Sequence, residues 1–380
     1  MGRRPWPHDP RQSGDRYVLS VVTDHHGHLR AEVDEGMTSS IEQRKSEHVE
    51  VVLTRNVGFR SVTTGFETVR FEHVALPEQS LDGIDTSCRF LGRTMRAPLI
   101  VSSMTGGPAR AERINVAIAC ACNSQGVGFG VGSQRIALES GEARGLGRNL
   151  RDLAPDVPIL ANFGAAQIGL GDGPELMRRA IDMIDADGLI IHLNSVQEAV
   201  QSGGDTDWRG LLAGIERMAR SADRPIIVKE VGFGISGAIA RRLWDAGVGI
   251  IDVAGAGGTN WAAVEAERAT EPHNRAVADG FRDWGIPTLQ ALEAVRAACP
   301  EATIIASGGI RDGVDVAKAI RMGADLAGVA AGVLAAADDG EDALSRRLRV
   351  IIAQLRIACF ATASADLPAL RHARLLPRAP

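Results

Sequence analysis

The sequence predicts a closed barrel of eight parallel strands that alternate with helices. Three observations support this fold: short apolar runs recur eight times from residue 97 onward, amphipathic segments of helical period separate most of them, and polar residues end the runs. Strands alternating with helices over about 260 residues are typical of a (β/α)8 barrel. An open, doubly wound sheet is the alternative. It is disfavoured because "SSMTGG", after the first run, lacks the glycine pattern with which such sheets bind nucleotides.

The eight predicted strands lie in residues 97–104, 126–133, 157–164, 187–194, 224–232, 247–257, 302–309 and 324–332. Helical period is clearest in residues 175–186, 236–246 and 315–324. Residues 1–40 are polar, and Pro-rich at first. We interpret them as a partly disordered N-terminal extension. Residues 41–380 are then one barrel domain.

Composition excludes several classes of function. The net charge of -5 and a pI near 6 argue against nucleic-acid binding, which favours a basic face. No apolar run is long enough to cross a bilayer, and the first residues lack the apolar core of a secretory signal. The five cysteines show no paired metal-binding spacing, so we expect neutral, mostly buried thiols in a cytoplasmic protein.

Polar residues at the ends of the runs predict a site at one end of the barrel. In such barrels the carboxyl ends of the strands face the active-site mouth. The run "IIHLNSVQEAV" supplies four of them: His192, Asn194, Gln197 and Glu198. The other runs contribute Ser103, Thr105, Ser133, Asn162, Lys229, Glu230, Asp252 and Ser307.

Two glycine-rich loops predict a phosphate site. Ser307-Gly308-Gly309 ends the seventh run and precedes a helix expected to begin near Gly313, which leaves backbone N–H groups available. Arg311 adds a positive charge, and backbone donors near Ala330 and Ala331 would complete the cradle. The alternative is a tight turn without a ligand.

The second glycine-rich loop follows the sixth run. Gly257 and Gly258 would permit close approach of the backbone to a ligand, and Thr259 supplies a hydroxyl. Together, the two loops suggest a phosphorylated cofactor fixed between them. Lys229 would place a positive charge beside the ring of that cofactor. Alternatively, it forms a structural ion pair with Glu230 or Asp252.

Three further charged residues have a functional and a structural interpretation. Arg44 and Lys45 lie in a mobile-looking segment that could fold over a diphosphate. They could equally belong to a solvated helix face with Glu42 and Glu47. Glu198 is the best candidate ligand for Mg²⁺, which usually takes one or two protein carboxylates plus phosphate oxygens. The alternative is a glutamate that stabilises a helix N-terminus.

Taken together, these motifs resemble the type 2, flavin-dependent isopentenyl-diphosphate isomerases. The resemblance covers about residues 43–360. It rests on "RKSEH", "SSMTGG", "VGSQR", "NFGAAQ", "HLNSVQE", "KEVGFGIS", "AGAGGTNW", "WGIPT" and "SGGIRDGVDVAKAI", which occur in the family's order. The motifs "HLNSVQE" and "MTGG" discriminate best, because "SGGIR" also occurs in other flavin and phosphate-binding barrels.

The resemblance implies an isomerase of isoprenoid biosynthesis with an FMN-binding barrel. It would interconvert isopentenyl and dimethylallyl diphosphate with reduced FMN, NADPH as reductant and Mg²⁺, as a homotetramer or larger assembly. Carried over, the FMN contacts are Met104, Thr105, Ser133, Asn162, Lys229 and Thr259, with Gly309, Arg311, Ala330 and Ala331 around its phosphate. Substrate binding falls to Arg44, Lys45, Arg135, His192, Asn194 and Gln197, metal binding to Glu198, and catalysis to Gln197 and His192.

The chemistry agrees with this assignment, because the isoprenoid tail offers no polar handle except its diphosphate. An allylic shift needs a proton added at one carbon and removed from another, by groups held within reach. The sequence departs from the family in residues 1–40, which are extra, and at Asn260, where Ser is more usual. Two other hypotheses stay open. One is an FMN-barrel oxidoreductase acting on a small hydroxy acid, and the other is a non-catalytic flavoprotein.

Overall fold

The structure is a computed structural model that describes residues 21–23, 29–31, 35–104, 109–140, 145–170 and 173–377. Side chains are described from Gln43 onward within these ranges, except at residues 109, 140, 169 and 170. The chain divides into two units, Met1–Ser40 and Ile41–Pro380. The first contains an antiparallel pair, β1 (Val21–Thr23) and β2 (Leu29–Ala31). Most of the segment that we expected to be partly disordered lies outside the described residues.

The second unit contains the predicted closed barrel of eight parallel strands. In order around the barrel they are β5 (Leu99–Val101), β6 (Gly128–Gly130), β7 (Ile159–Gly164), β8 (Gly188–Leu193), β9 (Ile226–Glu230), β10 (Ile250–Asp252), β11 (Thr303–Ala306) and β12 (Leu326–Val329). Each lies within one of the predicted runs, and β12 pairs with β5 to close the sheet. The strands read as continuous apolar runs because helices cover their outer faces and side chains fill the interior.

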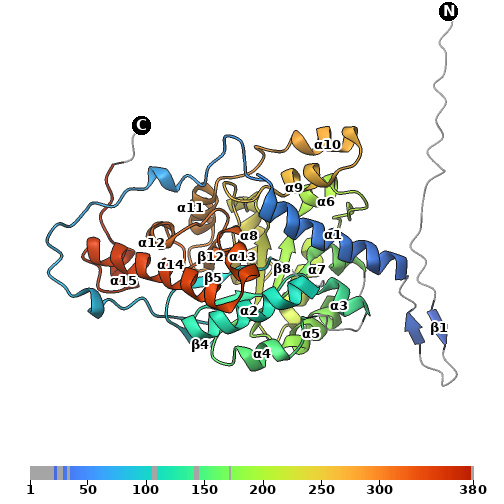
Figure 1. Cartoon of the computed structure of the whole chain (residues 1–380), viewed down its shortest axis with the longest axis horizontal. Coiled ribbons are helices and arrows are strands. Elements are labelled where there is room, and N and C mark those ends of the chain that lie inside the picture. The colour runs from blue at the N-terminus through green and yellow to red at the C-terminus, as the bar shows by residue number, and fades with distance from the viewer. Residues whose placement is uncertain are drawn as a thin grey trace, which may run out of the picture. The chain divides into compact units, whose positions relative to one another are not determined.

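Helices surround the strands, as Figure 1 shows. They are α2 (Ala109–Gln125), α3 (Arg135–Ser140), α4 (Asn149–Leu153), α5 (Gly173–Ile184), α6 (Ser195–Val200), α7 (Leu211–Ser221), α8 (Gly237–Asp245), α9 (Trp261–Arg268), α10 (Pro272–Asp279), α11 (Thr288–Ala298), α12 (Gly313–Arg321), α13 (Ala331–Asp339), α14 (Glu341–Ala361) and α15 (Leu367–Leu370). Short 3-10 turns are η1 (Phe66–Thr68), η2 (Leu81–Gly83) and η3 (Ala165–Leu170). Within the described part of the chain, no helix is long and apolar enough to cross a membrane.

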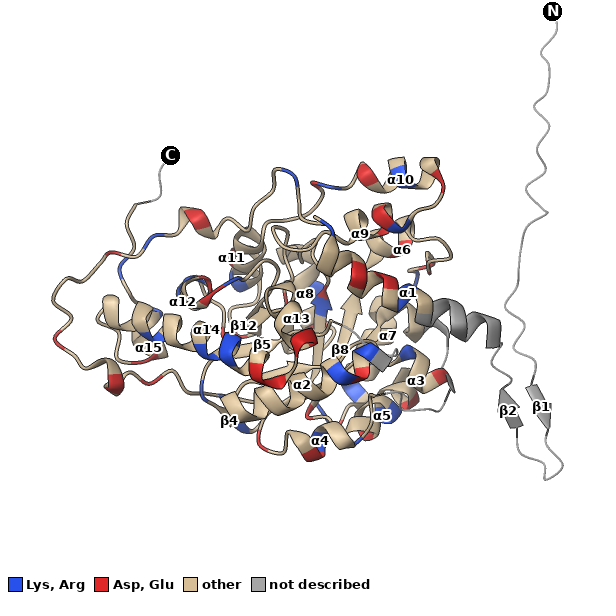
Figure 2. Ribbon diagram, viewed as in Figure 1, with Lys and Arg blue, Asp and Glu red and all other residues tan. Residues whose placement is uncertain are grey.

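A helix also precedes the barrel, where the sequence suggested a mobile segment. Helix α1 (Glu35–Thr54) contains Arg44 and Lys45, as the alternative interpretation expected, but both side chains are partly buried rather than solvated. In Figure 2, acidic and basic residues are spread over the helices in view rather than gathered on one of them.

A hairpin closes the interior of the barrel. Strands β3 (Cys88–Phe90) and β4 (Arg93–Met95) pair antiparallel around a turn at Leu91 and Gly92, both with positive φ. Phe90 and Met95 pack with apolar residues from seven barrel strands: Ile100, Leu160, Ile190, Ile227, Ile250, Ile305 and Leu326. Because the interior is filled in this way, a ligand has room only beyond the opposite ends of the strands.

An aspartate before β8 ties together the amino ends of two strands. Asp187 accepts hydrogen bonds from the backbone N–H of Ile159 at 2.9 Å and from Arg151 Nη2 at 2.6 Å. Its other oxygen accepts from Arg93 Nε at 2.8 Å, which fastens the hairpin to the barrel. Arg151 also donates to the carbonyl oxygens of Ala154, which caps its own helix α4, and of Val157 beyond it.

The same arrangement recurs half-way around the barrel. Asp325, before β12, accepts from the N–H of Ile304 at 2.9 Å and from Arg296 Nη2 at 2.7 Å. Its other oxygen accepts from Arg371 Nη2 at 2.9 Å, which fastens the C-terminal segment. The third and fourth strands are thus joined like the seventh and eighth. The charges at this end of the barrel therefore serve stability rather than chemistry.

Candidate functional site

A cavity of about 520 Å³ opens at the carboxyl ends of the strands. Its wall contains the cofactor, substrate and metal candidates of the sequence analysis except Thr105, which lies outside the described residues: Arg44, Lys45, Met104, Ser133, Arg135, Asn162, His192, Asn194, Gln197, Glu198, Lys229, Thr259, Gly309, Arg311, Ala330 and Ala331. Ser103 and Ser307 line it as well. The strand ends therefore meet as the barrel requires, whereas the role of each residue stays a prediction.

Two of the expected polar residues turn away from the cavity. The carboxylate of Glu230 accepts hydrogen bonds from the N–H groups of residues 231–234, at 2.6 to 3.3 Å. Burial raises its pKa to about 7, although these N–H groups favour the charged form. Asp252 accepts from Ser307 Oγ at 2.6 Å and from the N–H of Ala254. The prediction that both carboxylates face the mouth was wrong, because both shape the loops behind it.

Lys229 consequently forms no direct ion pair with Glu230 or Asp252. Its Nζ donates to the carbonyl oxygen of Glu230 at 2.6 Å, and the described residues form no ion pair with it within 4.0 Å. The side chain is 7% exposed and lines the cavity. Its charge still acts on both carboxylates and favours their ionised forms. A buried ammonium whose only direct partner among the described residues is a carbonyl oxygen favours an anionic or electron-rich ligand nearby.

Helix α1 forms a cationic wall of the cavity. Lys45 donates from Nζ to the carbonyl oxygen of Ser133 at 2.9 Å, which joins α1 to the loop after β6. Burial, then the charges of Arg44 and Arg135, lowers the pKa of Lys45 to about 8. Arg135 is held by Asp205 and Glu139, each at 2.9 Å. The charge of Arg135 is thus compensated by two carboxylates, whereas no carboxylate among the described residues forms an ion pair with Lys45.

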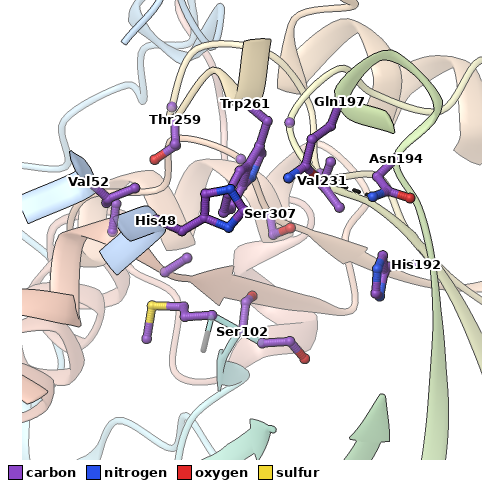
Figure 3. A pocket seen from close by; sticks show the side chains of 18 of the residues that line it. His48, Val52, Ser102, His192, Asn194, Gln197, Val231, Thr259, Trp261 and Ser307 are labelled. Carbon is purple, nitrogen blue, oxygen red and sulfur yellow. Dashed lines mark hydrogen bonds between the residues drawn. The ribbon is translucent and has the colours of Figure 1, made fainter. Parts of the chain in front are cut away.

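A chain of hydrogen bonds links α1 to the loop after β8. His48 Nε2 lies 2.8 Å from Glu265 Oε1, and Gln197 Nε2 donates to the same oxygen at 3.2 Å. The amide of Asn194 donates to Gln197 Oε1 at 3.3 Å and to Glu198 Oε1 at 2.8 Å. In Figure 3, His48 lies below Trp261, and Gln197, Asn194 and His192 follow one another along the facing wall. The amide of Gln197 is thereby oriented from both ends.

Glu265 is the centre of this chain. Burial by itself raises its pKa, but hydrogen bonds and charge from His48, Arg268 and Gln197 bring the pKa below its ordinary value. Arg268 Nη1 lies 2.6 Å from Glu265 Oε2 and also binds Glu47 of α1. Sequence reasoning missed both His48 and Glu265. His48 could have been found, because it follows Arg44 and Lys45 at the spacing of one helix turn. Glu265 is 217 residues from His48, and no local signal joins the two.

Glu198 offers one carboxylate to a cation. Its Oε2 accepts from Gln201 at 3.2 Å and from the N–H of Asp205 at 2.8 Å, so the group is fixed beside the cavity. The described residues contain no group of three or more His, Cys, Asp or Glu side chains that could hold a metal ion. A metal here would need oxygens from a ligand, as Mg²⁺ commonly does.

Helices α12 and α13, which follow β11 and β12, differ in whether side chains cap their first N–H groups. The N-terminal N–H groups of α12 are satisfied, because Asp312 accepts from Val314 and Asp315, and Gln354 accepts from Gly313. The prediction concerned the N–H groups of Ser307, Gly308 and Gly309, which these side chains do not bind, so it stays a prediction. Helix α13, in contrast, begins at Ala331 without a side-chain cap. Its free N–H groups fit a phosphate.

Close backbone packing explains the glycines of both loops. A Cβ on Gly258 would lie 2.5 Å from the nitrogen of Gly309, and one on Gly257 would lie 2.3 Å from that of Thr64. We predicted that Gly257 and Gly258 serve approach to a ligand. Gly257 packs against Thr64, and Gly258 packs against the other loop at Gly309. Both also line the cavity, so their approach to a ligand stays a prediction. Arg311 is held by Asp315 at 3.0 Å, so its charge is partly compensated.

Two buried hydroxyls without hydrogen-bond partners indicate that a polar ligand such as a flavin fits the cavity. Ser102 Oγ and Ser103 Oγ are buried and have no hydrogen-bond partner, and both residues line the cavity. Unsatisfied buried hydroxyls are costly unless a ligand completes them. Their position, the lone ammonium of Lys229 and the uncapped start of α13 together match the polar edge, ring and phosphate of a flavin nucleotide.

Sequence comparison identifies relatives over most of the chain. The FMN-dependent dehydrogenase family matches residues 37–142 and 192–376. The isopentenyl-diphosphate delta-isomerase of Stutzerimonas stutzeri (strain A1501) is 57% identical over 337 residues, which are 89% of this chain and 97% of that protein. The isomerases of Xanthobacter autotrophicus (strain ATCC BAA-1158 / Py2) and Cronobacter sakazakii (strain ATCC BAA-894) are both 56% identical, over 88% of this chain and 97% and 96% of theirs.

Similar solved structures share the barrel. One mandelate oxidase structure, of a variant bound to a bromo-hydroxy-methylphenylacetate, has a TM-score of 0.61 at 17% identity and covers 89% of this chain and 99% of its own. A lactate oxidase of Pediococcus acidilactici has a TM-score of 0.57 at 15% identity, over 89% and 94% of the two chains. At such identities the likeness establishes the fold alone.

Proposed function

The chain belongs to the FMN-dependent isopentenyl-diphosphate delta-isomerases, and we propose that it interconverts isopentenyl and dimethylallyl diphosphate with reduced FMN, Mg²⁺ and NADPH as reductant. One observation carries this proposal. Arg44, Lys45 and Arg135 line the same cavity as Lys229 and an amide, Gln197, that is oriented from both ends. A cationic wall suits a diphosphate, and an apolar tail would then lie near Gln197.

The proposed flavin contacts divide between the two ends of the cavity. The uncapped start of α13, with Gly309, would hold the phosphate, near the proposed contacts Arg311, Ala330 and Ala331. Lys229 would place positive charge beside the ring, near the proposed contacts Met104, Thr105, Ser133, Asn162 and Thr259. When bound and reduced, FMN would supply acid and base atoms next to the alkene. Apolar side chains of the cavity wall, such as Val52, Val231 and Trp261, would exclude water on this side.

The remaining site residues would bind and orient the substrate. Arg44, Lys45, Arg135, His192 and Asn194 would contact the diphosphate, and Glu198 would hold Mg²⁺ between itself and phosphate oxygens. Gln197 would lie against the reacting carbons. Because Glu265 Oε1 can only accept, the amide nitrogen of Gln197 stays directed toward it and the rotamer is fixed. We also propose that the enzyme is a cytoplasmic homotetramer or larger assembly. The five free cysteines support the compartment.

Product formation tests this proposal. Purified protein is incubated anaerobically with isopentenyl diphosphate, and dimethylallyl diphosphate is measured while FMN, NADPH or Mg²⁺ is left out in turn. We expect product only in the complete mixture. A small hydroxy acid serves as the rival substrate. Its oxidation without added reductant, with no conversion of isopentenyl diphosphate, would replace this proposal by an oxidoreductase. Light scattering of the same preparation measures the assembly state.

A further inference from the structure

The carboxamide of Asn162 has only one possible orientation. Its Nδ2 donates to the carbonyl oxygen of Val131 at 3.1 Å, and a carbonyl can only accept. Asn162 Oδ1 therefore faces His192 Nδ1, 2.9 Å away. The backbone N–H of Asn162 is also bound, by Gln134 Oε1 at 2.9 Å, and the residue is 4% exposed. Asn162 consequently requires a proton on Nδ1 of His192.

A neutral His192 then has its lone pair on Nε2. Among the described residues, no hydrogen bond reaches this nitrogen, and His192 lines the cavity. The charged groups that face the ring are both cations, Lys229 on β9 and Lys45 on α1. The uncharged amide of Gln167 lies nearby on η3. Burial, then these two charges, lowers the pKa of His192 to about 3. The free site thus holds a neutral imidazole.

A diphosphate oxygen and a bare Nε2 would both present lone pairs to each other. A proton between them removes this repulsion, whether it resides on the nitrogen or on the oxygen. A bound, multiply charged anion also counteracts the positive charges of the two lysines, which help to keep the imidazole neutral in the free site. We propose that Asn162 is a positioning residue that fixes the tautomer of His192, so that binding of a diphosphate takes up one proton at His192. This inference rests on the proposed function.

Calorimetry counts the proton. FMN-loaded, oxidised protein is titrated with isopentenyl diphosphate at pH 7.0 in excess Mg²⁺, in MOPS, HEPES and Tris, whose ionisation enthalpies differ. The oxidised cofactor prevents turnover, and excess Mg²⁺ keeps the ligand ionised before it binds. The dependence of the binding heat on buffer enthalpy gives the protons exchanged. We expect an uptake of about one proton per site.

Three variants separate the sources of that proton. His192→Gln keeps a hydrogen-bond donor that does not titrate, so the uptake should fall to near zero while the ligand still binds. Lys45→Arg keeps the charge and removes a cavity group whose pKa is about 8, so the uptake should persist. Glu230, whose pKa is about 7, is present in both variants, so a proton that it took up would remain in His192→Gln. Asn162→Asp should stabilise the imidazolium before binding and reduce the uptake, whereas a purely structural role of Asn162 would change the affinity and leave the proton count unchanged.

The outcomes distinguish this inference from the function on which it rests. If isopentenyl diphosphate binds the wild type without proton uptake, or if His192→Gln still takes up a proton, the inference is wrong and the proposed function stands. If Asn162→Asp folds, retains FMN and still takes up about one proton, the group at position 162 does not control the protonation of His192, and its positioning role is wrong. If no diphosphate binds at all, the proposed function fails together with the inference.

Discussion

At the scale of single residues, the cavity is built from side chains whose orientation is set by their hydrogen-bond partners. Glu265 is the clearest case, because one carboxylate serves His48, Gln197 and Arg268. An ionised carboxylate can only accept, so the amide nitrogen of Gln197 is directed toward it. The position of this amide depends on a residue that never needs to touch the substrate.

Replacing Glu265 by Gln tests that dependence. The new amide can accept only on one side and faces donors from His48 and Gln197, so Gln197 loses its fixed orientation. If Gln197 assists proton transfer, kcat should fall at least about 100-fold while KM for isopentenyl diphosphate changes little. Steady-state rates of the FMN-loaded variant measure this. The matched control is Glu267→Gln on the same helix, which pairs with Arg282 and Arg275 away from the cavity. Equal losses in both variants would refute a specific role.

His192 makes stability depend on pH in a defined direction. Its pKa lies near 3 in the folded chain, against an ordinary 6.5. Below pH 6.5 the unfolded chain takes up a proton that the folded chain does not, so this contribution is complete above 6.5 and is lost as pH falls toward 3. The loss should approach about 1.4 kcal/mol per pH unit. Urea unfolding at pH 7.5, 6 and 5 measures it. His192→Gln should show a correspondingly shallower decline, and parallel curves would contradict the buried, neutral state.

At the scale of elements, the sequence predicted the strands well and the loops poorly. An apolar run such as residues 187–194 must be buried wherever it lies, so its strand could be located from local pattern alone. A helix at α1 was one of the two interpretations, but its contact with the barrel was missed, because it depends on long-range partners such as Lys45 with Ser133 and His48 with Glu265. Likewise, nothing near Glu230 in the sequence indicated that its carboxylate would bind the next four N–H groups.

Asn260, where the family more often has Ser, has a structural function in the loop before α9. Its Oδ1 caps the helix by accepting from Ala263 N, and its Nδ2 donates to the carbonyls of Phe281 and Arg282 at 3.1 and 3.0 Å. Asn260→Ser keeps a cap but removes both donations, which should lower the free energy of unfolding by about 1–3 kcal/mol. Denaturant unfolding measures the loss. Asn260→Asp, which also caps but cannot donate, should lose at least as much. An unchanged midpoint in both would show that the two carbonyls find other partners.

At the scale of the whole molecule, stability and chemistry occupy opposite ends of the barrel. The amino ends of the strands are closed by the β3–β4 hairpin and tied by Asp187 and Asp325, whereas the carboxyl ends surround the cavity. This division could be predicted from the fold class alone. The two aspartate–arginine pairs, half-way around the barrel from each other, could not be predicted from the fold class. They depend on which strand end each arginine reaches.

The two ties should differ in strength because they differ in burial. Arg151 and Asp187 are 9% and 13% exposed, whereas Arg296 and Asp325 are 25% and 33% exposed. Arg151→Met leaves a buried carboxylate with one partner fewer and should cost about 3 kcal/mol of unfolding free energy. Arg296→Met should cost clearly less, since solvent screens that pair. Thermal unfolding ranks the variants, and neither should change KM for isopentenyl diphosphate. A change in KM would show that the two ends are coupled.

The measurement that tests the proposed proton transfers most directly is deuterium incorporation. The FMN-loaded protein is reduced with NADPH under anaerobic conditions and incubated with Mg²⁺ and isopentenyl diphosphate in D₂O, and NMR follows both diphosphates. We expect dimethylallyl diphosphate labelled with deuterium, with no labelling when NADPH is omitted. If the flavin is reduced and the diphosphate binds, but neither compound acquires deuterium, the cavity does not carry out the proposed proton transfers.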